Sequence, residues 1–189
     1  MRPESRFSSP NGWCGSPQLW HADDDQATEW EVSELVAAFV RALQPEHVIE
    51  TGTYTGQTSE AIGRALQKNG HGILTTFEID GRRATRAATR CRGLPVHVVR
   101  GRALDEIDAG ALRGLPWAGL VWIDSDPAVR AKELLAVAPY LGPGAVIGIH
   151  DTRPGRPAAV SLDRLVASGK LDALTLRTPR GVTFAQIRR

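Results

Sequence analysis

The stretch VIETGTYTGQTS, residues 48–59, carries Gly52 and Gly56 directly after an apolar run, with three residues between them. A glycine that follows a strand allows a tight turn and lets a ligand approach the backbone N–H groups at the start of the next helix. The stretch is not a P-loop, which has four residues between its glycines and then a lysine, whereas Gln57 follows Gly56 here. It also lacks the G-x-G-x-x-G of dinucleotide-binding proteins. The turn therefore predicts a cradle for another nucleotide-like ligand.

The acidic residue inside this stretch limits the charge of that ligand. Glu50 ends the apolar run, and a carboxylate repels phosphate but attracts an ammonium or sulfonium group. We therefore expect a zwitterionic or cationic ligand. Glu78 ends the next apolar run, where an acid accepts hydrogen bonds from ribose hydroxyls in nucleoside-binding α/β sheets.

Beyond this turn, short apolar runs alternate with helical patterns, which predicts parallel β-α-β units. Several runs lack polar alternation, as expected when helices cover both faces of a sheet. The last run, residues 173–187, has two β-like halves around a Pro and Gly turn and predicts an antiparallel hairpin. The fold class is thus α/β: a Rossmann-like, doubly wound, mostly parallel seven-stranded sheet. The expected strands before the hairpin are 47–51, 72–79, 96–100, 120–124 and 145–150, and the expected helices between and after them are 58–68, 82–91, 103–113, 128–140 and 158–168.

Right-handed crossovers bring the carboxyl ends of parallel strands to one edge of the sheet, where ligands bind. Acidic side chains follow four of the five predicted parallel strands. Each of them alone is equally well explained as a cap or turn former, but four acids on one edge indicate a site. The strand ends carry Glu50 and Thr51, Glu78 and Asp80, Gly101 and Arg102, Asp124 and Asp126, and His150 and Asp151.

Composition predicts one domain, because 189 residues with 42% hydrophobic content form about one sizeable core. The 23 basic and 21 acidic side chains nearly cancel and the arginines are scattered, so nucleic acid is not an expected partner. No apolar run approaches the roughly 20 residues of a membrane span, and the first residues lack the apolar core of a signal peptide. With only two cysteines, we expect a cytoplasmic protein.

The N-terminal residues 1–27 are rich in Ser, Pro, Gly and Asp yet contain Trp13 and Trp20. We expect a segment that docks on the single domain of residues 28–189. The tryptophans could form a lid over the site, or anchor the segment to the core or to a second subunit, as in a homodimer. TEWE, residues 28–31, has the form of a capping box and predicts that a helix begins at Thr28 and ends before Pro45.

Two of these segments resemble a known family. ETGTYTG, residues 50–56, and FEID, residues 77–80, are similar to the glycine motif and second-strand acid of the class I S-adenosylmethionine-dependent methyltransferases. LVWIDSD, residues 120–126, and the strand ending in HDT at residue 152 resemble the small-molecule O-methyltransferases related to the catechol, caffeoyl-CoA and macrocin enzymes. The final hairpin is similar to that of the macrocin-like branch. The resemblance covers residues 28–189 and implies methyl transfer to a hydroxyl of a small aromatic or sugar-containing acceptor.

The resemblance also implies a cofactor site for S-adenosylmethionine. Glu50 and Gly52 would hold its methionine end and Glu78 its ribose, and the turn Gly101 to Ala103 would flank the adenine. Arg102 stands where many relatives have an acid, so an acidic contact to adenine is not carried over. The full set of cofactor-binding residues implied by these motifs is Glu50, Gly52, Tyr54, Gly56, Thr58, Glu78, Arg102, Ala103 and Asp124.

In the metal-dependent relatives, two acids and an amide bind a divalent ion. These ligands correspond to Asp124, Asp151 and Thr152, with threonine in place of the amide. Oxygen ligands suit Mg²⁺ or another hard divalent cation. The resemblance thus implies a metal site in which one ligand departs from the pattern.

The base that accepts the proton of the hydroxyl cannot be carried over, because Pro127 departs from the relatives at this point. His150 is a candidate because it lies beside Asp151 at a strand end and histidine titrates in the useful range. Its alternative is a structural histidine hydrogen-bonded under the loop. His21 is a second candidate with a stronger structural alternative. The predicted catalytic residues are His150, Asp124 and Asp151.

Two other classes of function share parts of this pattern. A nicotinamide-dependent oxidoreductase would have the same fold and ribose acid, but the missing G-x-G-x-x-G weighs against it. A noncatalytic partner protein that retains a cofactor pocket would bind the cofactor without turnover.

Overall fold

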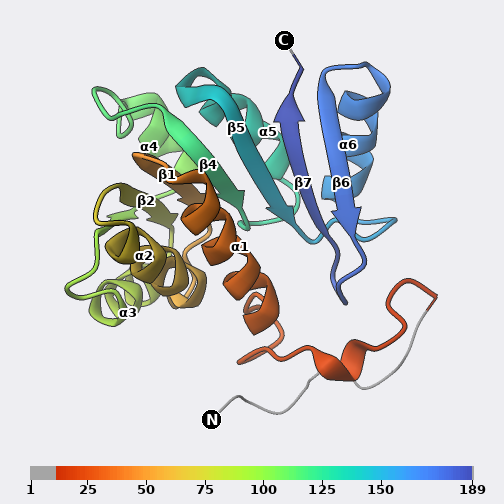
Figure 1. Ribbon diagram of the computed structural model, residues 1–189, viewed down its shortest axis with the longest axis horizontal. Helices are drawn as coiled ribbons and strands as arrows, with labels where there is room; N and C mark the ends of the chain where they lie inside the picture. The colour runs from red at the N-terminus through yellow and green to blue at the C-terminus, as the bar shows by residue number, and fades with distance from the viewer. Residues whose placement is uncertain (1–11, 189) are drawn as a thin grey trace.

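The protein forms one mixed sheet between two layers of helices in a computed structural model that describes residues 12–188 (Figure 1). The strands are β1 (His47–Thr51), β2 (Ile73–Glu78), β3 (Val96–Arg100), β4 (Ala118–Ile123), β5 (Leu141–His150), β6 (Leu171–Leu176) and β7 (Val182–Ile187). The helices are α1 (Trp30–Leu43), α2 (Gln57–Asn69), α3 (Gly81–Arg90), α4 (Ala103–Ala109), α5 (Arg130–Val137) and α6 (Pro157–Ala167), with the 3-10 helices η1 (Pro17–Leu19) and η2 (Ala138–Tyr140).

The strand order is β3-β2-β1-β4-β5-β7-β6, in which only β7 runs antiparallel to its neighbours. The order reverses between β1 and β4, so the crevice at a reversal of strand order lies beside the glycine turn that follows β1. The predicted seven-stranded, mostly parallel sheet with a C-terminal antiparallel hairpin is confirmed.

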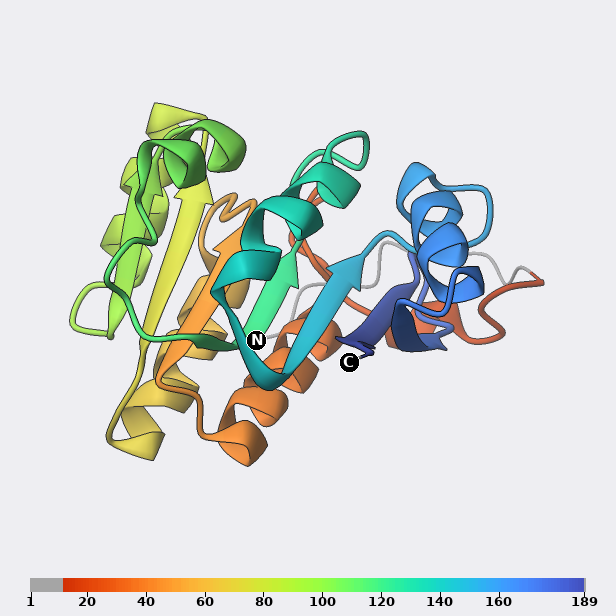
Figure 2. The same ribbon diagram turned by 90° about the horizontal axis from the view of Figure 1, so that it is seen from above.

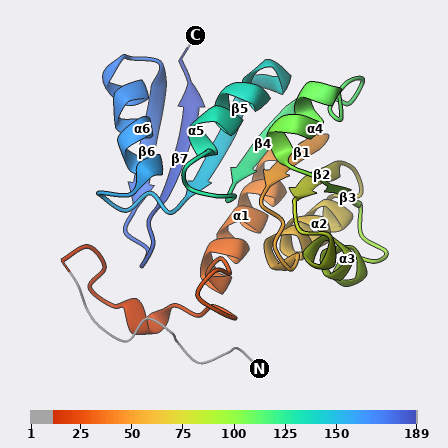
Figure 3. The same ribbon diagram turned by 180° about the vertical axis from the view of Figure 1, so that it is seen from behind.

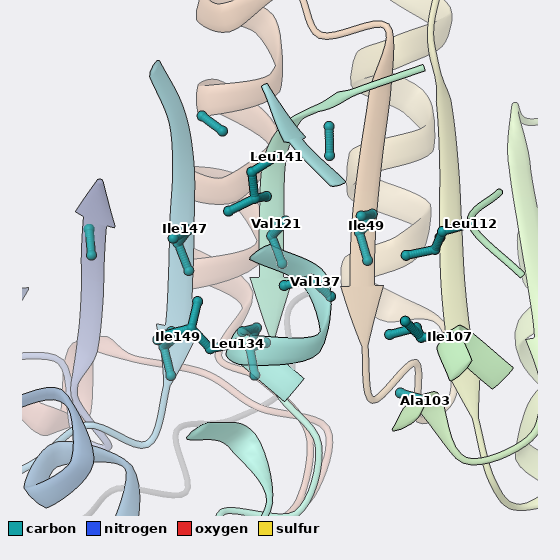
Figure 4. Packing of buried hydrophobic residues seen from close by; sticks show 14 of the residues in the cluster. Ile49, Ala103, Ile107, Leu112, Val121, Leu134, Val137, Leu141, Ile147 and Ile149 are labelled. Carbon is teal, nitrogen blue, oxygen red and sulfur yellow. The ribbon is translucent and has the colours of Figure 1, made fainter. Parts of the chain in front are cut away.

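The helices cover both faces of the sheet (Figures 2 and 3). On one face α1 and α2 pack over a cluster that includes Val36, Leu66 and the fully buried Trp122. On the other face α4, α5 and α6 pack over a second cluster built around Ile49 and Val121, shown in Figure 4. The central strands are therefore buried on both sides, which explains their unbroken apolar runs.

Several predicted boundaries were wrong; for example, β4 begins at Ala118 and α5 spans Arg130–Val137. The helix expected at 103–113 ends at Ala109, because Gly110 adopts a left-handed conformation with φ of 103° and caps it. The strand expected to begin at residue 145 begins at Leu141. The predicted capping box does not form: α1 begins at Trp30 after Glu29, which gives no side-chain cap, and the Thr28 hydroxyl instead donates to Asp124.

The part of the N-terminal segment that the structure describes lies along the edge where the parallel strands end (Figure 1). The Trp13 indole donates to the backbone oxygen of Thr178 at 3.0 Å, and Trp20 packs against the cluster under α1. Residues 1–11 of the predicted docking segment lie outside the described residues. No helix within residues 12–188 combines the length and apolar character needed to cross a membrane.

Candidate active site

A cavity of about 930 Å³ opens at the carboxyl edge of the sheet. The ends of β1 to β5 all contribute to its lining, as expected for a doubly wound sheet. The N-terminal segment adds Asp25 and Gln26, whereas neither Trp13 nor Trp20 lines the cavity. Of the sequence-predicted site residues, the lining includes Gly52, Tyr54, Glu78, Arg102, Ala103, Asp124 and Asp151.

Gly52 shapes the turn after β1. Its φ is 85°, and a Cβ at this position would lie 2.4 Å from the backbone oxygen of Asp124, so no other residue fits without displacing backbone. The next turn residue, Tyr54, also has a positive φ of 52°, and its backbone N–H donates to Glu78 Oε2 at 2.8 Å. The glycine turn and the acid after β2 are thus directly bonded to each other.

Three predicted cofactor residues do not line the cavity: Glu50 in β1, Gly56 at the end of the turn and Thr58 in α2. Glu50 is 1% exposed and accepts hydrogen bonds from the hydroxyls of Ser59 and Thr76. Burial raises the pKa of Glu50 to about 7 despite these bonds. Its second oxygen, Oε1, has no hydrogen-bond partner. In this arrangement Glu50 supports the turn from below.

Thr58 and Gly56 likewise make internal contacts. The Thr58 hydroxyl lies 3.0 Å from the hydroxyl of Ser33 in α1. Gly56, with φ of 84°, starts α2 where an added Cβ would meet the backbone of Ala87 in α3 at 2.9 Å. These residues fix the packing of α1, α2 and α3 around the turn.

Glu78 faces the cavity from the end of β2. Its Oε1 accepts from the backbone N–H of Asp80 at 2.9 Å, while Oε2 accepts from Tyr54, so the carboxylate is held in one orientation. Each oxygen retains acceptor capacity for a further donor. On the neighbouring strand β3, which pairs Arg100 with Glu78, the chain continues into the exposed Arg102 and then Ala103, which begins α4.

A buried cluster of charges closes the other side of the cavity, where β4 and β5 end. His150 is fully buried; its Nδ1 lies 2.9 Å from Asp124 Oδ1 and its Nε2 lies 2.6 Å from Glu29 Oε2. Burial alone would lower the pKa of His150, but the carboxylates of Asp124 and Glu29 outweigh it and raise the pKa to about 9. His150 is therefore an imidazolium at neutral pH.

This placement bears on the predicted base. Both ring nitrogens of His150 are engaged by carboxylates, and the side chain does not line the cavity. The geometry fits the structural alternative that the sequence left open. His21 is also engaged, because its Nδ1 lies 2.7 Å from Glu31 Oε1.

Two arginines complete the cluster. Arg130, which is 2% exposed, donates from Nη2 to Asp124 Oδ1 at 3.1 Å and to Asp151 Oδ2 at 2.9 Å. Arg180 binds Asp151 in a bidentate pair, with Nε to Oδ1 at 2.8 Å and Nη2 to Oδ2 at 2.9 Å. Burial would raise the pKa of Asp151, but His150 and the two guanidinium groups hold it well below its usual range.

The predicted metal ligands do not fit a divalent ion in this arrangement. One ligand atom each from Asp124, His150 and Asp151 lie within 4.8 Å of one another, a spacing that suits an ion. However, the guanidinium of Arg130 bridges the two carboxylates. The third predicted ligand, Thr152, accepts a hydrogen bond from the Thr183 hydroxyl at 2.9 Å, and it does not line the cavity.

Sequence reasoning missed Glu29, Arg130 and Arg180. Arg180 lies in the turn before β7, and this turn comes close to Asp151 because Val182 pairs with His150 in a register that only the folded chain shows. Arg130 opens the helix after the WIDSD segment, but no pattern marked it. Glu29 belonged to the expected capping box and was interpreted as part of a helix start.

Comparisons with known proteins identify the family and agree with the fold. Residues 49–152 match the model of a family described as a methyltransferase domain. The O-methyltransferase TomG of Streptomyces achromogenes, solved with SAM, superposes with a TM-score of 0.74 at 22% identity over 87% of this chain and 83% of that one. An O-methyltransferase from Bacillus cereus in complex with SAH superposes with a TM-score of 0.75 at 17% identity, covering 87% and 84% of the two chains. The SAH-bound methyltransferase PaMTH1 of Podospora anserina gives 0.71 at 16% identity over 87% and 81%. No curated protein matches the sequence.

Proposed function

The chain belongs to the family of methyltransferase domains, and from this premise we propose that it transfers the methyl group of S-adenosylmethionine to a hydroxyl of a small molecule. One observation carries the proposal: the Gly52 turn and the Glu78 carboxylate face one cavity at the reversal of strand order. Structural neighbours solved with SAM or SAH support the choice of cofactor.

In this proposal, different residues of the cavity bind different parts of the cofactor. The Gly52 turn would let the methionine end approach the backbone, and Glu78 would accept hydrogen bonds from the ribose hydroxyls. Arg102 and Ala103, at the end of β3, would flank the adenine. In this proposal Glu50 does not contact the charged groups of the cofactor. It is buried beneath the turn and supports it.

The acceptor occupies the side of the cavity where β4 and β5 end. Methyl transfer is an in-line displacement: the acceptor oxygen forms a bond to the methyl carbon while the carbon–sulfur bond breaks, and the hydroxyl proton leaves. Asp124 and Asp151 line this side and are held by Arg130, and His150 positions Asp124 from below. Asp126 also lines the cavity, is exposed and has no ion pair among residues 12–188. We therefore assign Asp126 as the base that accepts the proton of the hydroxyl.

Residues 12–27 act as a docked lid in this proposal, with Asp25 and Gln26 closing the cavity. Excluding water protects the reactive sulfonium. A small aromatic or sugar-containing acceptor, a cytoplasmic location and a homodimer stay predictions from the sequence.

Calorimetry with S-adenosylhomocysteine, followed by transfer of label from S-adenosylmethionine to a panel of phenols and glycosides, tests the proposal. We expect binding and label transfer, with transfer reduced in Asp126→Asn and unchanged in the exposed control Glu46→Gln. Binding without transfer to any acceptor would favour the noncatalytic alternative. Binding of NADH in place of S-adenosylhomocysteine would favour the oxidoreductase.

A further inference from the structure

We infer that the guanidinium groups of Arg130 and Arg180 take the place of a divalent cation at Asp124 and Asp151, so that this chain is a metal-independent methyltransferase. The inference rests on the proposed function for the reaction, whereas the absence of a metal follows from the charges around these two carboxylates alone. At this position the chain would differ from the metal-dependent relatives that its sequence resembles.

The carboxylate oxygens that would bind an ion are already bonded. Both oxygens of Asp151 accept from Arg180, and Oδ2 accepts from Arg130 as well. Asp124 Oδ1 accepts from Arg130 at 3.1 Å and faces His150 Nδ1, while Oδ2 accepts from the Thr28 hydroxyl at 2.5 Å. A hard divalent ion needs about six oxygen ligands within roughly 2.0–2.6 Å, and the two oxygens that Arg130 bridges, Asp124 Oδ1 and Asp151 Oδ2, each already have a second partner in His150 and Arg180.

The charges also balance without an ion. Two carboxylates, Asp124 and Asp151, face two guanidinium groups at distances between 2.8 and 3.1 Å. The His150 imidazolium, which contacts Asp124, is offset by the further carboxylate of Glu29. A guanidinium stays protonated in proteins, so these positive charges are permanent. A divalent ion placed between the carboxylates would add two positive charges beside two buried or half-buried cations, and like charges at such distances repel strongly.

Arg130 cannot easily move aside to admit an ion. Its Nη1 donates to the backbone oxygen of His150 and its Nε donates to the backbone oxygen of Ser125 at 2.9 Å, so the guanidinium is held by the strand ends of both β4 and β5. Withdrawing it would leave a buried charge without its partners, which is strongly unfavourable. Arg180 is tied in addition to the N-terminal segment, because its Nη1 donates to the backbone oxygen of Ala27 at 3.0 Å.

The cationic charge on the acceptor side is therefore built into the chain. Arg130 lines the cavity and lies between the two carboxylates, where it holds both in fixed orientation without an exchangeable ion. We assign Arg130 as a positioning residue, since it acts through Asp124 and Asp151.

Electron paramagnetic resonance with Mn²⁺ tests the inference on the full chain after treatment with a chelator, with and without S-adenosylhomocysteine. We expect the whole Mn²⁺ signal to remain that of the free ion up to millimolar concentrations. We also expect Mg²⁺, Mn²⁺ or a chelator to leave the melting temperature unchanged. Loss of the free signal with one ion bound per chain, abolished by Asp151→Asn, would overturn the inference.

Variants of Arg130 test whether its guanidinium occupies the position of an ion or only stabilises the fold. Arg130→Gln removes the charge and is expected to bind Mn²⁺ and to melt at a higher temperature when Mn²⁺ is added. Arg130→Lys keeps a charge and Arg64→Gln changes an exposed arginine, so neither should bind Mn²⁺. If Arg130→Gln folds but binds no ion, the guanidinium does not stand in an ion's place. The wild-type measurement decides alone if that variant does not fold.

Calorimetry on the same preparations keeps the two proposals distinguishable. If the wild type does not bind S-adenosylhomocysteine, the proposed cofactor is wrong, but the Mn²⁺ measurement still tests the metal-independent inference. Normal binding together with a bound ion would defeat only the metal-independent inference.

Discussion

His150 Nε2 lies 2.6 Å from Glu29 Oε2, although 121 residues separate the two in the chain, and both side chains are fully buried. Glu29 immediately precedes α1 and His150 ends β5. The pair therefore joins the start of the domain's first helix to the strand whose end lies beside the acceptor side of the cavity. Since Asp124 holds the other ring nitrogen, the imidazolium is enclosed by two carboxylates.

This enclosure predicts a dependence of stability on pH. The folded-state pKa of His150 is raised to about 9, above the roughly 6.5 of an unfolded chain. The stability that His150 contributes is therefore fully present below about pH 6.5 and is lost as the pH rises through about 9. Urea unfolding at several pH values should show this decline. His150→Gln should flatten it, whereas the exposed control His71→Gln should retain it; a decline that persists in His150→Gln would contradict the assignment.

Gly52→Ala should destabilise the protein more than its conformation alone predicts. Gly52 and Gly70 both have positive φ values, 85° and 79°, but an added Cβ meets the backbone of Asp124 at 2.4 Å in the first case and nothing within 4 Å in the second. Each alanine substitution should lower the free energy of unfolding by about 1–2 kcal/mol, because alanine is strained in the left-handed conformation. Gly52→Ala should lower the free energy of unfolding further, because two strand ends must move apart to make room for the Cβ. It should also weaken S-adenosylhomocysteine binding. Equal losses of unfolding free energy in the two variants would show that the close approach is unimportant.

The order of elements could be predicted from the sequence because it depends on local patterns. The apolar runs that became β1 and β4 are buried on both faces, and the glycine turn after β1 reflects a backbone constraint that leaves a clear trace. The capping box failed for a tertiary reason. Thr28 forms its hydrogen bond with Asp124, 96 residues away, and this contact outweighs the local preference for a cap.

The site was predictable in its position but not in its internal bonding. The motif acids Glu78, Asp124 and Asp151 all line the cavity, as the strand ends indicated. Arg130 and Arg180 could not be placed, because long side chains reach a carboxylate from any of several neighbouring elements, and only the folded chain fixes which. Glu50 shows the same limit: its position follows from the motif, but its burial beneath the turn depends on Ser59 and Thr76.

Glu78→Ala should weaken binding of S-adenosylhomocysteine by roughly tenfold or more. Each hydrogen bond to a charged group is worth about 1.5–3 kcal/mol, and the ribose would lose its acceptor. Glu78→Gln should have a smaller effect, because the amide oxygen can still accept one bond. Calorimetry gives the affinities, with the exposed Glu46→Gln as the control. Unchanged affinity in Glu78→Ala would remove the ribose assignment.

Tyr54→Phe should loosen the N-terminal segment where it lies over the cavity. The Tyr54 hydroxyl donates to Asp24 Oδ2 at 2.6 Å, and Asp24 Oδ1 accepts from the backbone N–H groups of Gln26 and Ala27 at 2.8 Å each. The variant keeps the ring and its contact with the guanidinium of Arg83, whose centre lies 4.6 Å from the ring centroid, and loses only the hydroxyl.

Loss of that one hydrogen bond, worth about 0.5–1.5 kcal/mol, should speed exchange of the backbone N–H groups of Gln26 and Ala27 by roughly two- to tenfold. Hydrogen exchange measured with and without S-adenosylhomocysteine tests this expectation. Tyr140→Phe is the matched control, because its hydroxyl has no hydrogen bond within residues 12–188. Affinity for the cofactor should change little, because the backbone N–H of Tyr54 still donates to Glu78. If exchange in the segment is the same in Tyr54→Phe and Tyr140→Phe, the hydroxyl does not hold the segment over the cavity, and its closure depends on Arg180 and Ala27 instead.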